Sequence, residues 1–267
     1  LQKQISEVEL KWKSLLFEGA RQIFAHTNLP SHNHWHHYRV WQYAKELIEV
    51  ASTIRTLTYN EIEHLIVAIF FHDTGMSITR DESHGKESKI ICEDFFRSGN
   101  IRPPEGFHHA LKAIEEHDDK TTLHTGKKHN ISVKLLVSTA DDLDAFGYIG
   151  ILRYAEIYLL RGIQTETLGH RVINNAAKRF QNFKTIFGNK ALTNRHLKRY
   201  EILQDFYKNM HKRENNKIID HIKEKVFKTK PEHLKDLIYT SDNKSISQYF
   251  HQGLEKELKL FHSSTII

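Results

Sequence analysis

Cysteine, proline and glycine are all scarce in this chain. Its 267 residues include a single cysteine, Cys92, which excludes a disulfide framework and any cysteine-based zinc site. Only 12 glycines and 4 prolines punctuate the sequence, which favours long helices with short connections over an all-β architecture. No apolar run approaches the roughly 20 residues of a membrane span, and nothing near Leu1 resembles a signal peptide. We therefore expect a cytoplasmic protein without a membrane partner.

The basic residues outnumber the acidic ones. There are 39 Lys and Arg against 33 Asp and Glu, a formal net charge of +6. Much of the excess lies beyond Lys178, where acids such as Glu201 and Asp205 interrupt the basic residues. This alternation is typical of a solvated helical face, so we do not expect nucleic acid as a partner. An anion-attracting patch stays open as the alternative, and it would suit a small phosphorylated substrate.

Apolar residues recur at three- and four-residue spacing along most of the chain, which predicts an all-α fold. We expect a loop at 74–81, a polar loop at 118–130 that forms a mobile flap near the site, and bends at Gly147 and Gly150. No linker divides the chain, so we expect a single domain at 1–267, with a core at about 30–151 and a C-terminal helical extension at about 152–267. The predicted helices span residues 5–26, 36–51, 60–72, 83–96, 107–117 and 131–144, with more helices to about 228 and a weakly periodic tail from 229.

His72 and Asp73 end the strongly apolar run Ile69-Phe70-Phe71. Ionisable side chains in such a place are costly unless they are paired or bound to metal. A neutral imidazole beside a carboxylate forms half of a divalent-metal site. By itself the pair is weak evidence, because a satisfied core histidine next to a helix-ending aspartate is the commoner situation.

Other predicted helices also place ionisable side chains on their inward faces. Several helices that each offer one inward ligand are how a helical bundle builds a metal site. The residues in question are His36, His84, His117 and Asp141, with Asp142 competing with Asp141 one residue out of phase.

The sequence resembles the HD-domain metal-dependent phosphohydrolases between about Pro30 and Ile151. The matching pieces are His36-His37-Tyr38-Arg39-Val40, His72-Asp73 and the segment 139–145. The stretch ADDLDAFGYIGILR at 140–153 is similar to the small bacterial nucleotide-pyrophosphohydrolase branch. The resemblance implies an all-α HD-domain helical bundle with additional C-terminal helices. The register of Arg39 and Val40 selects His36, and leaves His32, His34 and His37 as surface or capping residues.

This ligand set implies a divalent ion held by His36, His72, Asp73 and Asp141. Mn, Fe, Ni or Zn would suit it, and Mg less well because of the nitrogen ligands. Water on such an ion is acidified and can attack phosphorus. His84 and His117 either protonate the leaving oxygen or contact the substrate, the roles we slightly prefer, or they bind a second ion bridged by Asp73, so one or two ions stay open. The candidate substrate-binding residues are Lys86, Asp144, Arg153 and Lys178.

We therefore expect a metal-dependent phosphohydrolase that cleaves a phosphoester or phosphoanhydride of a small phosphorylated substrate, with a nucleotide as the preferred choice. The lack of a Gly-Tyr-Pro segment argues against the cyclic-di-nucleotide phosphodiesterases, and Thr74-Gly75-Met76 after His72-Asp73 argues against the alarmone hydrolases. The alternatives are an HD-type di-iron oxygenase and a non-catalytic nucleotide-sensing HD domain. A homo-oligomer stays open.

Overall fold

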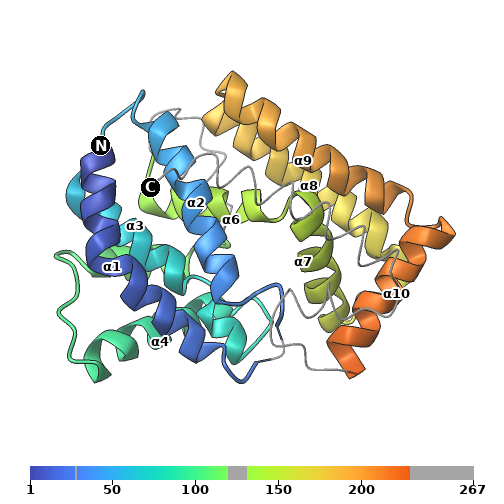
Figure 1. The fold of residues 1–267 in the computed structure, drawn as a ribbon, viewed down its shortest axis with the longest axis horizontal. Coiled ribbons are helices and arrows are strands. Elements are labelled where there is room, and N and C mark those ends of the chain that lie inside the picture. The colour runs from blue at the N-terminus through green and yellow to red at the C-terminus, as the bar shows by residue number, and fades with distance from the viewer. Residues whose placement is uncertain (28, 120–130, 229–267) are drawn as a thin grey trace. The chain divides into compact units, whose positions relative to one another are not determined.

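The computed structural model describes residues 1–27, 29–119 and 131–228, and within these ranges it contains α-helices, one short 3-10 helix and no strand. The all-α prediction is confirmed (Figure 1). The predicted flap at 118–130 lies outside the described residues except for its first two, and the tail from 229 lies wholly outside them. The elements are α1 (Gln2–Ile23), α2 (His34–Ala51), α3 (Tyr59–Phe71), η1 (Thr74–Ser77), α4 (His84–Ser98), α5 (His108–Glu115), α6 (Val133–Asp144), α7 (Gly147–Leu160), α8 (Thr165–Phe187), α9 (Lys190–Lys208) and α10 (Arg213–Lys228).

The chain divides into two compact units. The described part of the first comprises residues 1–26, 32–119, 131–143 and 182–189, so it holds α1 to α5, most of α6 and the end of α8. The described part of the second comprises residues 27, 29–31, 144–181 and 190–228. The single-domain organisation at 1–267 stays a prediction.

Helix α3 is the centre of the first unit, and α1, α2, α4 and α5 all pack against it. The Thr58 side chain accepts the Glu61 N–H while the Glu61 carboxylate accepts the Thr58 N–H, a capping box that begins the helix. Every residue from Ile62 to Phe71 is buried. A helix that is apolar around its whole circumference must be enclosed on all sides, and this one ends where His72 and Asp73 begin.

Two buried residues of this core with polar groups, Glu63 and Trp41, are hydrogen-bonded to α1. Glu63 on α3 is buried, and its carboxylate accepts hydrogen bonds from the Trp12 indole at 2.8 Å and the Lys11 ammonium at 2.6 Å. Trp41 on α2 donates to Glu9 on α1 at 2.6 Å in the same way. These bonds link α1 to α2 and α3, because a buried indole N–H is usually paired with a hydrogen-bond acceptor.

In the second unit α7 packs against α9 and α10. Phe180 on α8 stacks on Tyr200 of α9, with ring centroids 4.5 Å apart and planes 7° from parallel. Arg199 donates to the Phe146 carbonyl at 2.9 Å, and the Tyr207 hydroxyl donates to the Ile151 carbonyl at 2.8 Å. These bonds occupy carbonyls near the start of α7.

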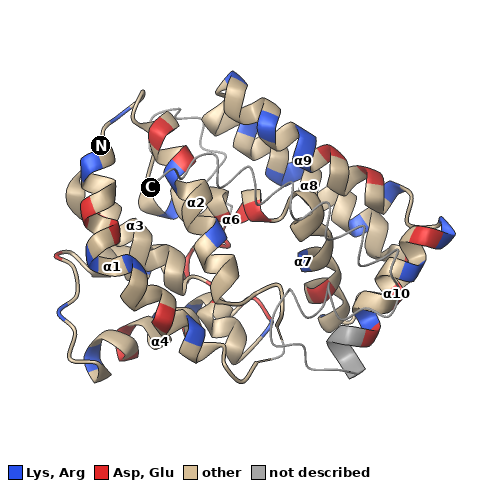
Figure 2. Cartoon of the chain, viewed as in Figure 1, with Lys and Arg blue, Asp and Glu red and all other residues tan. Residues whose placement is uncertain are grey.

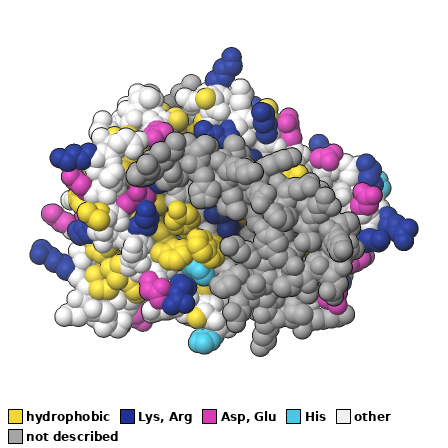
Figure 3. All heavy atoms as spheres, in the orientation of Figure 1, with side chains coloured by type: hydrophobic (Ala, Val, Ile, Leu, Met, Phe, Trp, Pro, Cys, Tyr) yellow, Lys and Arg dark blue, Asp and Glu magenta, His cyan; other side chains and the backbone are white. Residues whose placement is uncertain are grey.

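The remaining expectations about local structure mostly hold. Helix boundaries fall within a few residues of those predicted, and Gly147 makes the expected bend with a φ of 72°. Gly150, the other expected bend, lies instead within the continuous helix α7. The loop predicted at 74–81 is confirmed at 78–81 but not at Thr74–Ser77, which forms η1, closed by the Met76 N–H on the Asp73 carbonyl. Figure 2 shows the described Lys, Arg, Asp and Glu residues interspersed along the helices. The space-filling view in Figure 3 shows both signs of charge around the face that it draws. Among the described helices, none combines the length and apolar character that a bilayer crossing requires.

Candidate metal centre

Four buried side chains of the first unit converge at the end of α3. They are His36 from α2, His72 and Asp73 from the junction after α3, and Asp141 from α6. The His36 Nε2 atom lies 3.2 Å from His72 Nε2, 3.2 Å from Asp73 Oδ2 and 3.5 Å from Asp141 Oδ1. The His72 Nε2 atom lies 3.8 Å from the same Asp141 oxygen. The structure therefore brings the four predicted ligands together.

A second buried group adjoins the first and consists of Asp73, His84 and His117. His84 is the first residue of α4 and His117 follows the end of α5. Their Nε2 atoms lie 3.3 Å from each other, and 3.3 Å and 3.1 Å respectively from Asp73 Oδ1. His84 is buried, with only 2 % of it exposed.

Asp73 belongs to both groups and divides its two oxygens between them. Oδ2 faces His36 and His72, at 3.2 and 3.4 Å, whereas Oδ1 faces His84 and His117. A carboxylate with ligand atoms on both sides could bridge two ions if each group held one.

Three of the histidines share one local motif, in which the ring Nδ1 contacts the carbonyl oxygen three residues earlier. His72 contacts Ile69 at 2.8 Å, His84 contacts Asp81 at 2.7 Å and His117 contacts Ile114 at 2.8 Å. A carbonyl can only accept, so Nδ1 carries the proton. At the ends of α3 and α5 the motif also satisfies carbonyls that the terminating helix leaves without an amide partner. In a neutral ring the Nε2 atom then presents a lone pair to the centre.

Nitrogen lone pairs that face one another and face two carboxylates repel unless positive charge lies between them. The pKa values of these residues agree with this. Burial alone would lower the pKa of His72, but the Asp73 charge and contacts with Asp141 and Asp73 outweigh it and raise the pKa to about 10. Burial likewise opposes the hydrogen bond and charge of Asp73 at His84, whose pKa rises to about 9. Burial would raise the pKa of Asp73, yet His72, His117 and His36 hold it well below its usual range. The centre attracts cations, protons included.

The residues fit a divalent metal ion. Ligands about 2.1 Å from an ion, the usual bond length to histidine nitrogen, lie about 3 Å apart when they are adjacent. The distances of 3.1–3.5 Å from His36 and from Asp73 to their neighbours approach this spacing. Imidazole with carboxylate is a donor set for Mn, Fe, Ni or Zn, and is less suited to Mg. These buried His and Asp residues could therefore hold a divalent ion.

The predicted substrate-binding residues belong to neither of the two ligand groups. Lys86 is exposed on α4, two residues after His84. Asp144, Arg153 and Lys178 belong to the second unit. There the buried Asp144 and Arg153 form an ion pair of 3.2 Å, and Lys178 is exposed on α8. Substrate binding by these four residues stays a prediction.

The prediction that His32, His34 and His37 are surface or capping residues was wrong, because all three are buried. The cap of α2 is Asn33, whose side chain accepts the Trp35 N–H at 3.0 Å. Each of the three histidines instead packs against another aromatic ring or contacts a backbone carbonyl. His34 packs on Phe17, His32 packs on His36, and His37 Nδ1 lies 2.8 Å from the Ile69 carbonyl that His72 also uses. Burial and the neighbouring His72 and His36 lower the pKa of His37 well below its usual value, so it stays neutral.

One acidic residue beside the centre is missing from the sequence prediction. Asp118 places Oδ2 3.3 Å from His84 Nε2 and Oδ1 3.8 Å from His117 Nε2. The signal in the sequence is its position directly after His117, but four acids between 115 and 119 hide which of them faces inward.

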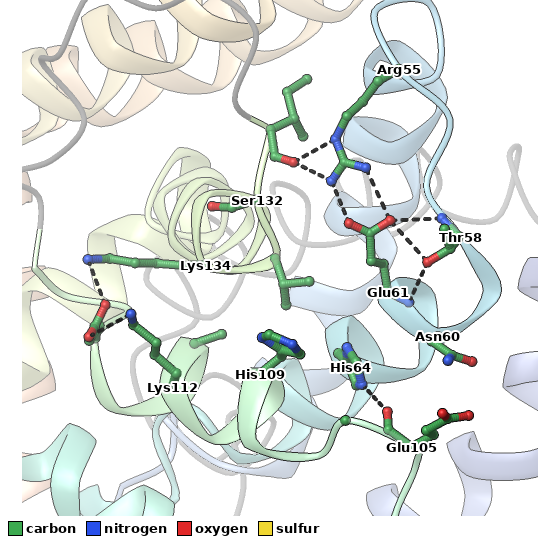
Figure 4. A pocket seen from close by; sticks show the side chains of 15 residues that line it. Arg55, Thr58, Asn60, Glu61, His64, Glu105, His109, Lys112, Ser132 and Lys134 are labelled. Carbon is green, nitrogen blue, oxygen red and sulfur yellow. Dashed lines mark hydrogen bonds and ion pairs between the residues drawn. The ribbon is translucent and has the colours of Figure 1, made fainter.

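The first unit also contains a cavity of about 800 Å³ at the beginnings of α3, α5 and α6. No member of the two ligand groups is among the described residues that line it. Most of its charged side chains are engaged with one another, as with Arg55 on Glu61, and His64 Nε2 lies 2.6 Å from the Glu105 carbonyl (Figure 4). The cavity is therefore distinct from the metal centre in its residues.

Comparison with known proteins agrees with this geometry. A family model described as HD-CE, an HD-type domain, matches residues 24–239, which include every residue of both ligand groups. No curated protein and no solved structure matches the chain. The likeness to the nucleotide-pyrophosphohydrolase branch stays a prediction. With a match over most of its length and the buried His and Asp residues of such a domain in place, the chain belongs to the HD-CE family.

Proposed function

We propose that this protein is a metal-dependent phosphohydrolase that uses two divalent ions to cleave a small phosphorylated substrate. The observation that carries the proposal is the position of Asp73, which turns one oxygen toward each of two buried histidine groups. Ions held there would acidify a water molecule and offset negative charge on a phosphate group.

The residues of the centre contribute orientation and charge. The Nδ1 contacts of His72, His84 and His117 hold each ring with its Nε2 atom inward, which avoids reorganisation when a ligand arrives. The two carboxylates, Asp73 and Asp141, bring two negative charges, whereas two divalent ions bring four positive ones. The remaining excess of positive charge favours a phosphate dianion over a neutral substrate.

For the substrate we propose a nucleotide. Support comes from the likeness of residues 140–153 to nucleotide-pyrophosphohydrolases and from the net charge of +6. Lys86 is the first candidate for a phosphate contact, because it is exposed near the first turn of α4, close in sequence to His84.

A hydrolysis screen tests this function. Purified protein would be supplied with Mn²⁺, Fe²⁺, Ni²⁺ or Zn²⁺ and offered nucleotides and general phosphoesters, with phosphate and pyrophosphate release measured and O₂ uptake followed in parallel. We expect metal-dependent release that disappears in Asp141→Asn and persists in Asp94→Asn, which alters an exposed carboxylate on α4. Iron-dependent O₂ consumption without hydrolysis would establish the oxygenase alternative instead. Tight nucleotide binding with neither reaction would establish the sensor.

A further inference from the structure

Asp118 lies in the turn that follows α5, at the solvent side of the second ligand group. The Asp119 N–H donates to the Glu116 carbonyl at 3.0 Å and closes this turn. The Asp118 carboxylate faces His84 with one oxygen and His117 with the other, at 3.3 and 3.8 Å. Its side chain is 46 % exposed, whereas that of His117 is 1 % exposed. The carboxylate thus spans the edge between buried imidazoles and water.

The neighbouring acids are all turned toward lysines. Glu115 pairs with Lys89 of α4 at 2.8 Å. Glu116 and Asp119 both pair with Lys134 of α6, at 3.4 and 3.3 Å, and Figure 4 shows Lys134 pointing toward the carboxylate at the end of α5. Because Lys134 holds the acids on both sides of it, the turn directs Asp118 away from that lysine and toward the histidines.

The atoms that Asp118 faces are the Nε2 nitrogens of His84 and His117. The Nδ1 atoms of His84 and His117 are committed to carbonyl oxygens, so neutral rings present bare Nε2 lone pairs to Asp118. Carboxylate oxygens close to such lone pairs repel them unless a cation lies between. We propose that Asp118 is a ligand of the second metal ion, beside Asp73, His84 and His117. This inference rests on the proposed two-ion function.

The donor sets support the assignment. The first group offers two imidazoles and two carboxylates. With Asp118 the second group offers the same set, and the two share Asp73. Both positions then suit the same class of transition metal. The half-exposed Asp118 makes the second ion the one that exchanges more readily with solvent.

Metal titration of the chain tests the assignment without relying on activity. Mn²⁺ binding would be followed by calorimetry and by metal analysis after dialysis, in wild type, Asp118→Asn and Asp119→Asn. Asparagine keeps the shape of the side chain and removes its charge. Asp119→Asn is the matched control, because this residue lies in the same turn but faces Lys134. Melting of the metal-free variants shows whether each is folded.

We expect two ions per wild-type chain and per Asp119→Asn chain. In Asp118→Asn the first ion should bind as in wild type, while the affinity for the second falls at least about tenfold. Two ions bound with wild-type affinity in Asp118→Asn would overturn the assignment and leave the two-ion function standing, with Asp118 reduced to an ion-pair partner of His84. A wild-type chain that takes one ion, unaffected by His84→Ala, would overturn both.

Discussion

Replacing Asp73 with asparagine removes the one charge that both ligand groups share. The substitution preserves the volume of the side chain but takes the anionic oxygens away from His36 and His72 on one side and from His84 and His117 on the other. We expect both ions to be lost. Asp141→Asn touches the first group alone, so it should leave the second ion in place.

The magnitude follows from binding linkage. A ligand at about 100 times its dissociation constant stabilises the folded state by roughly 2.7 kcal/mol, so two independent ions contribute about 5 kcal/mol. In a protein of this size each kcal/mol moves the melting temperature by about 2–4 °C. Saturating Mn²⁺ should therefore raise the melting temperature of wild type by roughly 10–20 °C, that of Asp141→Asn by about half as much, and that of Asp73→Asn hardly at all.

Differential scanning fluorimetry with and without metal measures these shifts. Each variant is compared with its own metal-free form, because Asp73→Asn also removes the partner of a protonated His72 and so changes the stability of the metal-free protein. Asp94→Asn, at the surface of α4, should keep the full shift. A full wild-type shift in Asp73→Asn would refute the bridging role of this carboxylate.

Three further outcomes are expected. The raised pKa of His72 gives the metal-free protein stability that is complete below pH 6.5 and is lost as the pH rises through about 10. Saturating metal should remove this alkaline loss of stability. Melting temperatures that fall with pH in parallel for the metal-free and metal-bound forms would contradict the prediction. Gly75→Ala should destabilise by about 3 kcal/mol or more, since a Cβ there would overlap the His84 carbonyl and lie 2.7 Å from the Ser88 nitrogen; denaturant unfolding measures this, and a neutral result would contradict the packing. Glu63→Ala should cost about 1–3 kcal/mol by stranding the buried Trp12 N–H, with metal stoichiometry unchanged; loss of metal would show that the core and the centre are coupled.

The first ligand group could be predicted because helical periodicity carries the necessary information. His36, His72 and Asp141 each continue an apolar stripe, so an ionisable group on such a stripe needs an explanation from the sequence alone. The all-α fold follows from the same periodicity and from the scarcity of glycine and proline.

The role of the second group could not be predicted in the same way. Whether His84 and His117 bind an ion or donate a proton depends on which ring nitrogen is committed elsewhere, and the contacts with Asp81 and Ile114 appear only when the helix ends are built. Asp118 has no periodic signal, because it lies in a turn among other acids. The burial of His34 and His37 was missed for a related reason: polar residues were assigned outward, although aromatic contacts and a single carbonyl suffice to enclose an imidazole.

The contacts between three histidines and carbonyls of their own segments have a mechanical consequence. The ring Nδ1 atoms of His72, His84 and His117 each contact the carbonyl oxygen three residues earlier. A change in the orientation of one of these rings must therefore break that contact or move the helix end. An ion in the first group would hold the end of α3, an ion in the second group would hold the start of α4 and the end of α5, and Asp73 would link the two. Loss of the ions should then increase local opening of the backbone at those helix ends. Amide hydrogen exchange should then report occupancy of the centre, with protection concentrated around residues 69–76, 84–88 and 114–118 and little change along α1.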